Sequence, residues 1–147
     1  MRLKNVAGIK DATSNMQRQS QHRQLLGDKY IALTGEDATA LGYNAHGGVG
    51  AISVSSNVAP RLCAEFQATC AKGDYKTALR QHDHLMPLHD ALFVETNPAP
   101  VKYAAWRLGV IDSPECRLPL APLTEATKKI VDAALAKVGL LKATAAE

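Results

Sequence analysis

The sequence predicts an α/β domain in which three parallel strands come first and helices follow. Residues 5–10, 30–34 and 51–55 form short apolar runs without helical periodicity, which is typical of buried strands. Helical segments separate these runs, and no two-residue hairpin turn joins them, so parallel pairing through right-handed crossovers is expected. From Asn57 onward the hydrophobic pattern is helical throughout.

Two helices are expected between the strands. The first begins near Ser14, because Ser14 and Gln17 have the spacing of a capping box. It should end at Gly27, since glycine suits the left-handed position that follows a helix. A second, short helix over residues 38–44 leads to the glycine-rich loop 47–50 and then to the third strand.

Further helices are expected after the last strand. Asn57 is placed to cap a helix over residues 59–72, and Asp74 is placed to cap the next one. A last amphipathic helix covers residues 124–138. Its apolar face is expected to bury Ile130, Val131, Ala134, Leu135 and Val138.

The composition excludes several classes of protein. The chain has 147 residues, 46% hydrophobic and 21% charged, which is ordinary for a soluble globular domain. A formal net charge of +3 is too weak to indicate nucleic acid as a partner. No apolar run approaches the ~20 residues of a membrane span, and the amino terminus lacks a secretory signal. Three cysteines without a Cys-x-x-Cys pair argue against a disulfide framework or a zinc ribbon. We therefore expect a cytoplasmic protein with neither nucleic acid nor membrane as a partner.

The order of the predicted elements is unusual for a complete domain. The first strand begins almost at Met1 and would leave an unpaired edge. Parallel strands rich in valine and isoleucine normally have both faces covered. The chain therefore has the pattern of the second half of a larger unit, and we expect it to form a homo-oligomer or to associate with the missing half.

Lys10 is the first candidate for chemistry. It follows the apolar run of the first strand, and sites in α/β folds collect at the carboxyl ends of strands. Apolar surroundings disfavour the ammonium form of a lysine, and a free amine can attack a carbonyl to form a Schiff base. The alternative is structural: Lys10 extends to solvent or pairs with Asp11. The residues alone favour this alternative.

Five segments of the chain form a recognisable set. They are GIKDAT at 8–13, TGEDA at 34–38, GVGAISV at 48–54, LFVETNPAPVK at 92–102 and LPL at 118–120. The first resembles the segment around the Schiff-base lysine of the dihydrodipicolinate synthase family, also named 4-hydroxy-tetrahydrodipicolinate synthase. The others resemble further segments of that family in its order and spacing, and the resemblance extends to about Leu141.

The resemblance implies a fold and a division of the chain. Residues 1–72 would be the carboxyl-terminal part of a (β/α)8 TIM barrel, with its last three parallel strands. Residues 73–141 would form a helical extension, and residues 142–147 a tail. A complete barrel needs about 250 residues, so the resemblance covers only part of the family's fold.

The resemblance also implies an activity, that of a pyruvate-dependent class I aldolase in lysine (diaminopimelate) biosynthesis. Lys10 would condense with the ketone of pyruvate, and the backbone of Ile52 would contact the bound pyruvate. Gly35 and Asn97 match positions associated with the second substrate, aspartate semialdehyde, although Glu36 departs from the Asp or Asn usual beside that glycine. No metal and no organic cofactor are implied, because the lysine itself is the electron sink.

Several parts of the family's site have no counterpart in this sequence. They are the threonine pair for the pyruvate carboxylate, the proton-relaying tyrosine, the carboxylate-binding arginine and the site for feedback inhibition by lysine. Efficient turnover by the chain alone is therefore not expected. Two alternatives remain. The chain could be a non-catalytic, self-associating remnant, or it could belong to a sister aldolase such as N-acetylneuraminate lyase, although residues 93–98 favour the synthase.

The histidines and cysteines have simpler interpretations. His82, His84 and His89 could suggest a metal site, but residues two apart on a helix point to different sides. His82 and His89 lie on the apolar stripe of their helix and are expected to be hydrogen-bonded core histidines. Cys63 and Cys70 are expected to be small buried hydrophobic residues.

Overall fold

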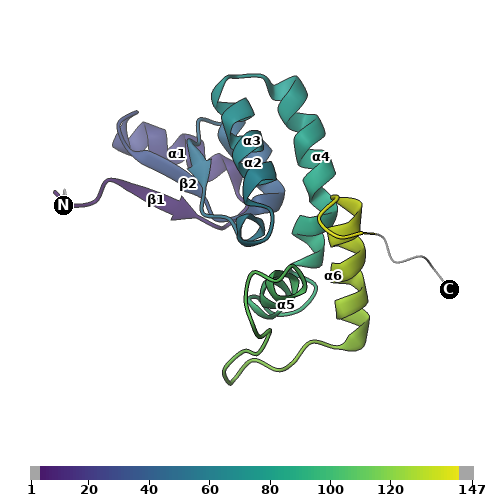
Figure 1. Cartoon of the computed structure of the whole chain (residues 1–147). Helices are drawn as coiled ribbons and strands as arrows, with labels where there is room; N and C mark the ends of the chain where they lie inside the picture. The colour runs from purple at the N-terminus through teal and green to yellow at the C-terminus, as the bar shows by residue number, and fades with distance from the viewer. Residues whose placement is uncertain (1–3, 143–147) are drawn as a thin grey trace.

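In the computed structural model, which describes residues 4–142, a parallel sheet is followed by a group of helices. The strands lie in the order β1-β2-β3, and each outer strand pairs on one side only. Figure 1 shows α1, α2 and α3 beside the sheet, α5 and α6 in a second part, and α4 running between the two. The strands and helices are β1 (Gly8–Asp11), α1 (Met16–Leu26), β2 (Ile31–Thr34), α2 (Ala40–Ala45), β3 (Gly50–Ala51), α3 (Pro60–Ala71), α4 (Tyr75–Ala91), α5 (Ala99–Arg107) and α6 (Glu125–Lys137). Two short 3-10 turns follow the second and third strands, η1 (Asp37–Thr39) and η2 (Ser55–Asn57).

The two faces of the sheet are in different environments. Ala32 and Thr34 of β2 are each 1% exposed on the face that the helices cover. Ile31, which alternates with them, is 47% exposed on the other face. The prediction of fully buried strands is therefore wrong for this face, because no helix within residues 4–142 packs on it.

The third strand is shorter than its sequence suggests. A strand over residues 51–55 is predicted, whereas β3 consists of Gly50 and Ala51 only. The reason is a distant side chain, since the backbone N–H groups of Val54 and Ser55 donate to the Asp37 carboxylate. Those two N–H groups therefore cannot donate hydrogen bonds within the sheet, and the chain turns into η2.

The predicted helix caps are correct for some helices and wrong for others. Asp74 accepts a hydrogen bond from the Thr77 N–H and caps α4, as predicted. Ser14 does not cap α1; its neighbour Asn15 does, by accepting from the Gln17 N–H at 3.1 Å. Asn57 does not cap α3 either, because its side-chain amide donates to the Val54 carbonyl oxygen.

The main core lies among α3, α4, α5 and α6. The predicted burial of the last helix is confirmed for Val131, Ala134, Leu135 and Val138. It is wrong for Ile130, which is 45% exposed because it lies about 100° around the helix from Val131. None of the helices in residues 4–142 is long and apolar enough to cross a membrane.

Two histidines of α4 are packed in this core. His89 is buried, and its Nδ1 lies 2.7 Å from the Ser55 hydroxyl, which confirms the predicted hydrogen bond. His82 lies 6.2 Å from His89 between ring centroids, but its buried Nδ1 has no hydrogen-bond partner in the described part of the chain, so the prediction is wrong for His82. Burial lowers the pKa of both rings.

This burial predicts that the chain loses stability in mild acid. A neutral histidine in the folded state binds fewer protons than the same residue unfolded, whose pKa is about 6.5. The free energy of unfolding should therefore be constant near pH 8 and should fall as the pH drops below about 6.5. Urea unfolding at pH 8, 6.5 and 5.5 measures this. His82→Phe should flatten the decline, whereas His84→Gln, at an exposed position of the same helix, should leave it unchanged. Equal slopes in both variants would contradict this interpretation.

Candidate functional site

Lys10 lies near the carboxyl end of β1. It pairs in register with Leu33 of β2, one residue beyond the pair Ile9 and Ala32. Because side chains alternate along a strand, Lys10 lies on the face opposite the buried Ala32. That face is the uncovered one, and Lys10 is accordingly exposed. The expectation that apolar neighbours surround its amine is not met within residues 4–142.

Gly35 is directly beside Lys10. It follows β2, and its N–H donates to the Asp11 carbonyl oxygen at 2.7 Å. A Cβ atom at Gly35 would overlap the Lys10 Cε and would lie 2.8 Å from the Ala12 Cβ. The absence of a side chain at Gly35 therefore leaves the space in which the Lys10 side chain lies.

Ile52 follows β3 at the same end of the sheet. Its N–H donates to the Thr34 carbonyl oxygen at 2.8 Å, so its carbonyl is the backbone group that it can offer to a ligand. Its side chain is 49% exposed. The carboxyl ends of adjacent parallel strands meet at one edge of a sheet, and the structure thus places Lys10, Gly35 and Ile52 along one edge.

Asn97 lies in a different place. It is exposed in the connection between α4 and α5, and it lines a cavity of about 370 Å³ together with Val54 and Asn57. Val54 is two residues beyond Ile52. The structure therefore brings Asn97 to the segment that follows β3, rather than to the Lys10 side chain.

The Asp11 side chain has partners other than Lys10. One carboxylate oxygen accepts from the N–H and the hydroxyl of Thr13, and the other lies 2.9 Å from the Arg18 Nε. Burial raises the pKa of Asp11, but the hydrogen bonds from Thr13 and Arg18 outweigh it and hold the pKa below its usual value. The alternative in which Lys10 pairs with Asp11 is therefore wrong, because Asp11 is buried and bonded toward α1.

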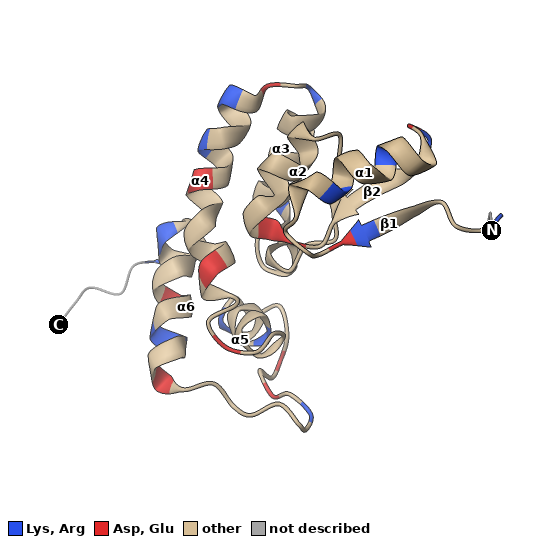
Figure 2. Cartoon of the chain, turned by 180° about the vertical axis from the view of Figure 1, so that it is seen from behind, with Lys and Arg blue, Asp and Glu red and all other residues tan. Residues whose placement is uncertain are grey.

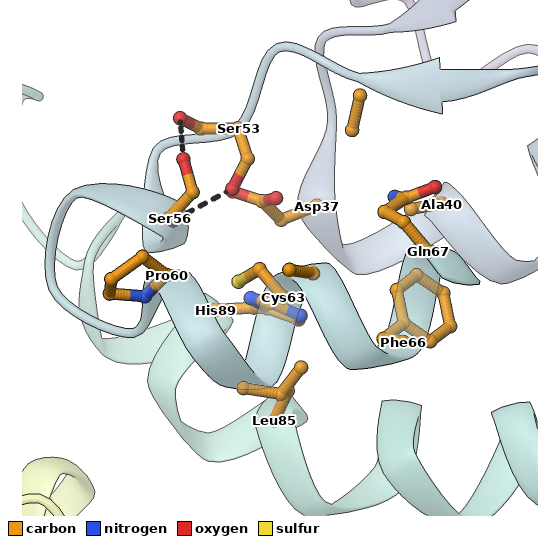
Figure 3. A pocket seen from close by; sticks show the side chains of 12 residues that line it. Asp37, Ala40, Ser53, Ser56, Pro60, Cys63, Phe66, Gln67, Leu85 and His89 are labelled. Carbon is orange, nitrogen blue, oxygen red and sulfur yellow. Dashed lines mark hydrogen bonds between the residues drawn. The ribbon is translucent and has the colours of Figure 1, made fainter. Parts of the chain in front are cut away.

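A second buried carboxylate lies behind this edge and was not among the predicted site residues. Asp37 is 5% exposed, and one of its oxygens accepts from both the Val54 and Ser55 N–H groups. Figure 3 shows the Asp37 carboxylate beside the loop that carries Ser53 and Ser56, at the rim of a cavity of about 220 Å³. Asp37 is part of the TGEDA segment, but nothing in its local sequence distinguishes it from Glu36.

The remaining polar groups are consistent with a structural role. Burial raises the pKa of the Cys63 thiol to about 11, and Cys70 is buried as well, as predicted for both cysteines. Within residues 4–142, no three His, Cys, Asp or Glu side chains are arranged to hold a metal ion. Acidic and basic positions alternate along α6, whereas along α4 the basic positions come first and the acidic positions follow (Figure 2).

Several proteins of known family are similar to this chain. The model of the dihydrodipicolinate synthetase family matches residues 1–138. The 4-hydroxy-tetrahydrodipicolinate synthase of Methylobacterium radiotolerans is 62% identical over 139 residues, which are 95% of this chain and 46% of that protein. The synthase of Bartonella tribocorum is 58% identical over 95% of this chain and 47% of its own length. The chain thus spans about half the length of the curated relatives that it matches.

Solved structures give the same result. Dihydrodipicolinate synthase from Aquifex aeolicus superposes with a TM-score of 0.91 and 37% identity, over 97% of this chain and 48% of that one. The chloride-inhibited enzyme from Acinetobacter baumannii, complexed with pyruvate, gives a TM-score of 0.89 and 36% identity over 95% and 48%. Sequence and structure therefore agree that this chain belongs to the dihydrodipicolinate synthetase family.

Proposed function

We propose that this chain is the lysine-bearing, carboxyl-terminal part of a 4-hydroxy-tetrahydrodipicolinate synthase. This enzyme of lysine (diaminopimelate) biosynthesis condenses pyruvate with aspartate semialdehyde. The observation that carries the proposal is the packing of Lys10 against Gly35 at the carboxyl edge of the sheet, with Ile52 following the neighbouring strand. The 62% identity to a curated synthase supports the same conclusion.

The proposed chemistry begins at the Lys10 amine. Its nitrogen attacks the pyruvate ketone, water leaves, and a Schiff base forms. Loss of a proton from the pyruvate methyl group gives an enamine, because the protonated imine accepts the electron pair. The enamine carbon attacks the aldehyde of the second substrate, and attack by that substrate's own amine then releases Lys10. The electron sink is the imine of Lys10, so these steps call for no metal or organic cofactor.

The other site residues act by binding. The Ile52 carbonyl oxygen contacts the pyruvate part, since its N–H is already used by Thr34. Gly35 and Asn97 contribute to the binding site for aspartate semialdehyde. Gly35 borders Lys10, whereas Asn97 lines the cavity beyond the third strand.

The proposal includes a division of the chain and a partner. Residues 1–72 would form the last three βα units of a (β/α)8 barrel, residues 73–141 a helical extension, and 142–147 a tail that lies outside the described residues except for Lys142. The uncovered sheet face carries Ile31, which is 47% exposed, and the adjoining residues Val49 and Ile52 are 69% and 49% exposed. These exposed apolar side chains support association with the rest of the enzyme or, without it, with a second copy. All three cysteines are free, which suits a cytoplasmic location.

Reductive trapping tests the proposal on the chain as it is. The chain is incubated with pyruvate and borohydride, and intact mass and peptide mapping follow. We expect a single adduct, equal to pyruvate plus two hydrogens minus water, on Lys10. Lys10→Ala should abolish it, whereas Lys29→Ala, at an exposed position before β2, should leave it unchanged.

The opposite result would identify the main alternative. A folded chain, confirmed by circular dichroism, that forms no adduct on Lys10 would contradict the proposal. It would favour a non-catalytic fragment that associates through its exposed sheet face. An adduct spread over many lysines would also contradict a specific site.

A further inference from the structure

We propose that Asp37 is a positioning residue of the pyruvate site, which it holds in place through the segment after β3. The inference rests on the proposed function, because it assigns a purpose to the placement of the Ile52 carbonyl. It concerns a residue that lies outside the set of Lys10, Gly35, Ile52 and Asn97.

The Asp37 carboxylate makes two charge-assisted hydrogen bonds to one segment. Its Oδ2 lies 2.9 Å from the Val54 nitrogen and 3.0 Å from the Ser55 nitrogen. Asp37 is only 5% exposed, so water does not readily replace the carboxylate as an acceptor. Hydrogen bonds to a charged acceptor are roughly twice as strong as neutral ones, and buried N–H groups without an acceptor are costly.

A second anchor holds the other end of the same segment. The Ile52 N–H donates to the Thr34 carbonyl oxygen at 2.8 Å. Thr34 and Asp37 are only three residues apart, at the end of β2 and the start of η1. Residues 52–55 are therefore attached at both ends to one short stretch of chain. The Ile52 carbonyl lies between the two attachments, and its direction depends on both.

The segment is also attached to the helical part of the molecule. Ser55 is 0% exposed, and its hydroxyl lies 2.7 Å from the buried His89 Nδ1 of α4. Figure 3 shows Asp37 and His89 around the same cavity, on either side of Cys63. Asp37 thus joins the end of β2 to the segment after β3, and α4 contacts this segment from the other side. The position of Ile52 therefore depends on β2, on the segment itself and on α4.

Removal of the carboxylate should weaken pyruvate binding more than it weakens chemistry at Lys10. The test measures borohydride trapping over a range of pyruvate concentrations. It gives the concentration for half-maximal trapping and the trapping rate at saturation. We expect Asp37→Ala to raise the half-maximal concentration about tenfold, and Asp37→Asn, which keeps one acceptor oxygen without the charge, about threefold. The rate at saturating pyruvate should change by less than about twofold, because Lys10 is on another strand.

Asp74→Ala is the matched control. Asp74 also accepts a backbone N–H, from Thr77 at 3.1 Å, but it does so at the exposed start of α4. This variant loses a similar interaction, and its half-maximal concentration should equal that of the original chain. Circular dichroism at the assay temperature verifies folding, and if Asp37→Ala does not fold, Asp37→Asn decides alone.

The outcomes separate this inference from the function on which it rests. If the original chain forms no adduct, the proposed function fails and the positioning role fails with it. If the original chain is trapped on Lys10 and the folded Asp37 variants have its half-maximal concentration, only the positioning role is overturned. A shift of the same size in Asp74→Ala would also overturn it, since the effect would then reflect stability.

Discussion

Addition of the remainder of a full-length synthase should raise turnover by this chain by about 10²-fold or more. The proposed site has its nucleophile, Lys10, but the groups that would relay protons and clamp carboxylates are expected from residues that this sequence does not contain. A positioned proton-transfer group contributes about 10²–10⁴-fold to a rate, and correct orientation contributes further. Restoring those groups in trans therefore has the largest effect that we predict.

The structure supplies a surface for such a complex. Within the described residues 4–142, each outer strand, β1 and β3, pairs on one side only, and the sheet face between them carries the exposed Ile31. Closing a barrel would pair both edges and cover Ile31. Association should therefore add hydrogen bonds and apolar burial at the same time.

The experiment uses the synthase of Methylobacterium radiotolerans, of which this chain matches 46%. The part of that protein outside the match is co-expressed with this chain, and the mixture is assayed for consumption of pyruvate in the presence of aspartate semialdehyde. Lys10→Ala in this chain should abolish the gain, because the added part lacks the nucleophile. Size-exclusion chromatography reports whether the two chains elute together.

Two results would contradict this prediction. Chains that elute separately would show that the exposed face does not accept the remainder of a synthase. A stable complex without turnover would show that the edge of the sheet does not form a competent site even when it is covered.

Local sequence signals were sufficient for part of the fold. Gly27 and Gly73 have positive φ angles after their helices, and Asp74 caps α4, because each feature depends on a few neighbouring residues. The cap of α1 was misplaced by one residue. Thr13 donates a hydrogen bond to the Asp11 carboxylate, and Ser14, the residue after Thr13, has a φ of 58°. Asn15 caps the helix instead of Ser14.

Errors in the sheet and in the site have a common cause in contacts between distant residues. The third strand is short because Asp37, seventeen residues away, takes the Val54 N–H. The role of Asp37 was not predicted, since only the folded chain brings two N–H groups to its carboxylate. Lys10 and Gly35 were predicted from family motifs, but the packing of one against the other is visible only in three dimensions.

The packing of Lys10 against Gly35 gives the second large effect. Gly35→Ala should lower the rate of reductive trapping on Lys10 at least about tenfold at a fixed pyruvate concentration. The new methyl group would occupy the place of the Lys10 Cε. The Lys10 side chain is flexible and can move away, whereas the Ala12 Cβ, 2.8 Å from the new methyl group, moves only with its backbone. The chain should therefore stay folded with a small decrease in its unfolding temperature, while its amine leaves the position that the site requires. Trapping followed by mass spectrometry measures the rate, and thermal unfolding measures stability.

Gly42→Ala separates this steric effect from a general effect of replacing glycine. Gly42 lies within α2, and a Cβ there would meet only the Met16 side chain, at 3.4 Å from its sulfur. Alanine in a helix is more stable than glycine by roughly 0.5–1 kcal/mol, so Gly42→Ala should keep the trapping rate and match or exceed the original unfolding temperature.

Trapping of Gly35→Ala at the original rate would show that the position of the Lys10 amine does not depend on Gly35. A loss of trapping together with a much lower unfolding temperature would instead assign the effect to folding. A loss of trapping with only a small decrease in unfolding temperature is the result that the geometry predicts, because the added methyl group displaces the exposed Lys10 side chain and shifts the backbone only locally, at Ala12.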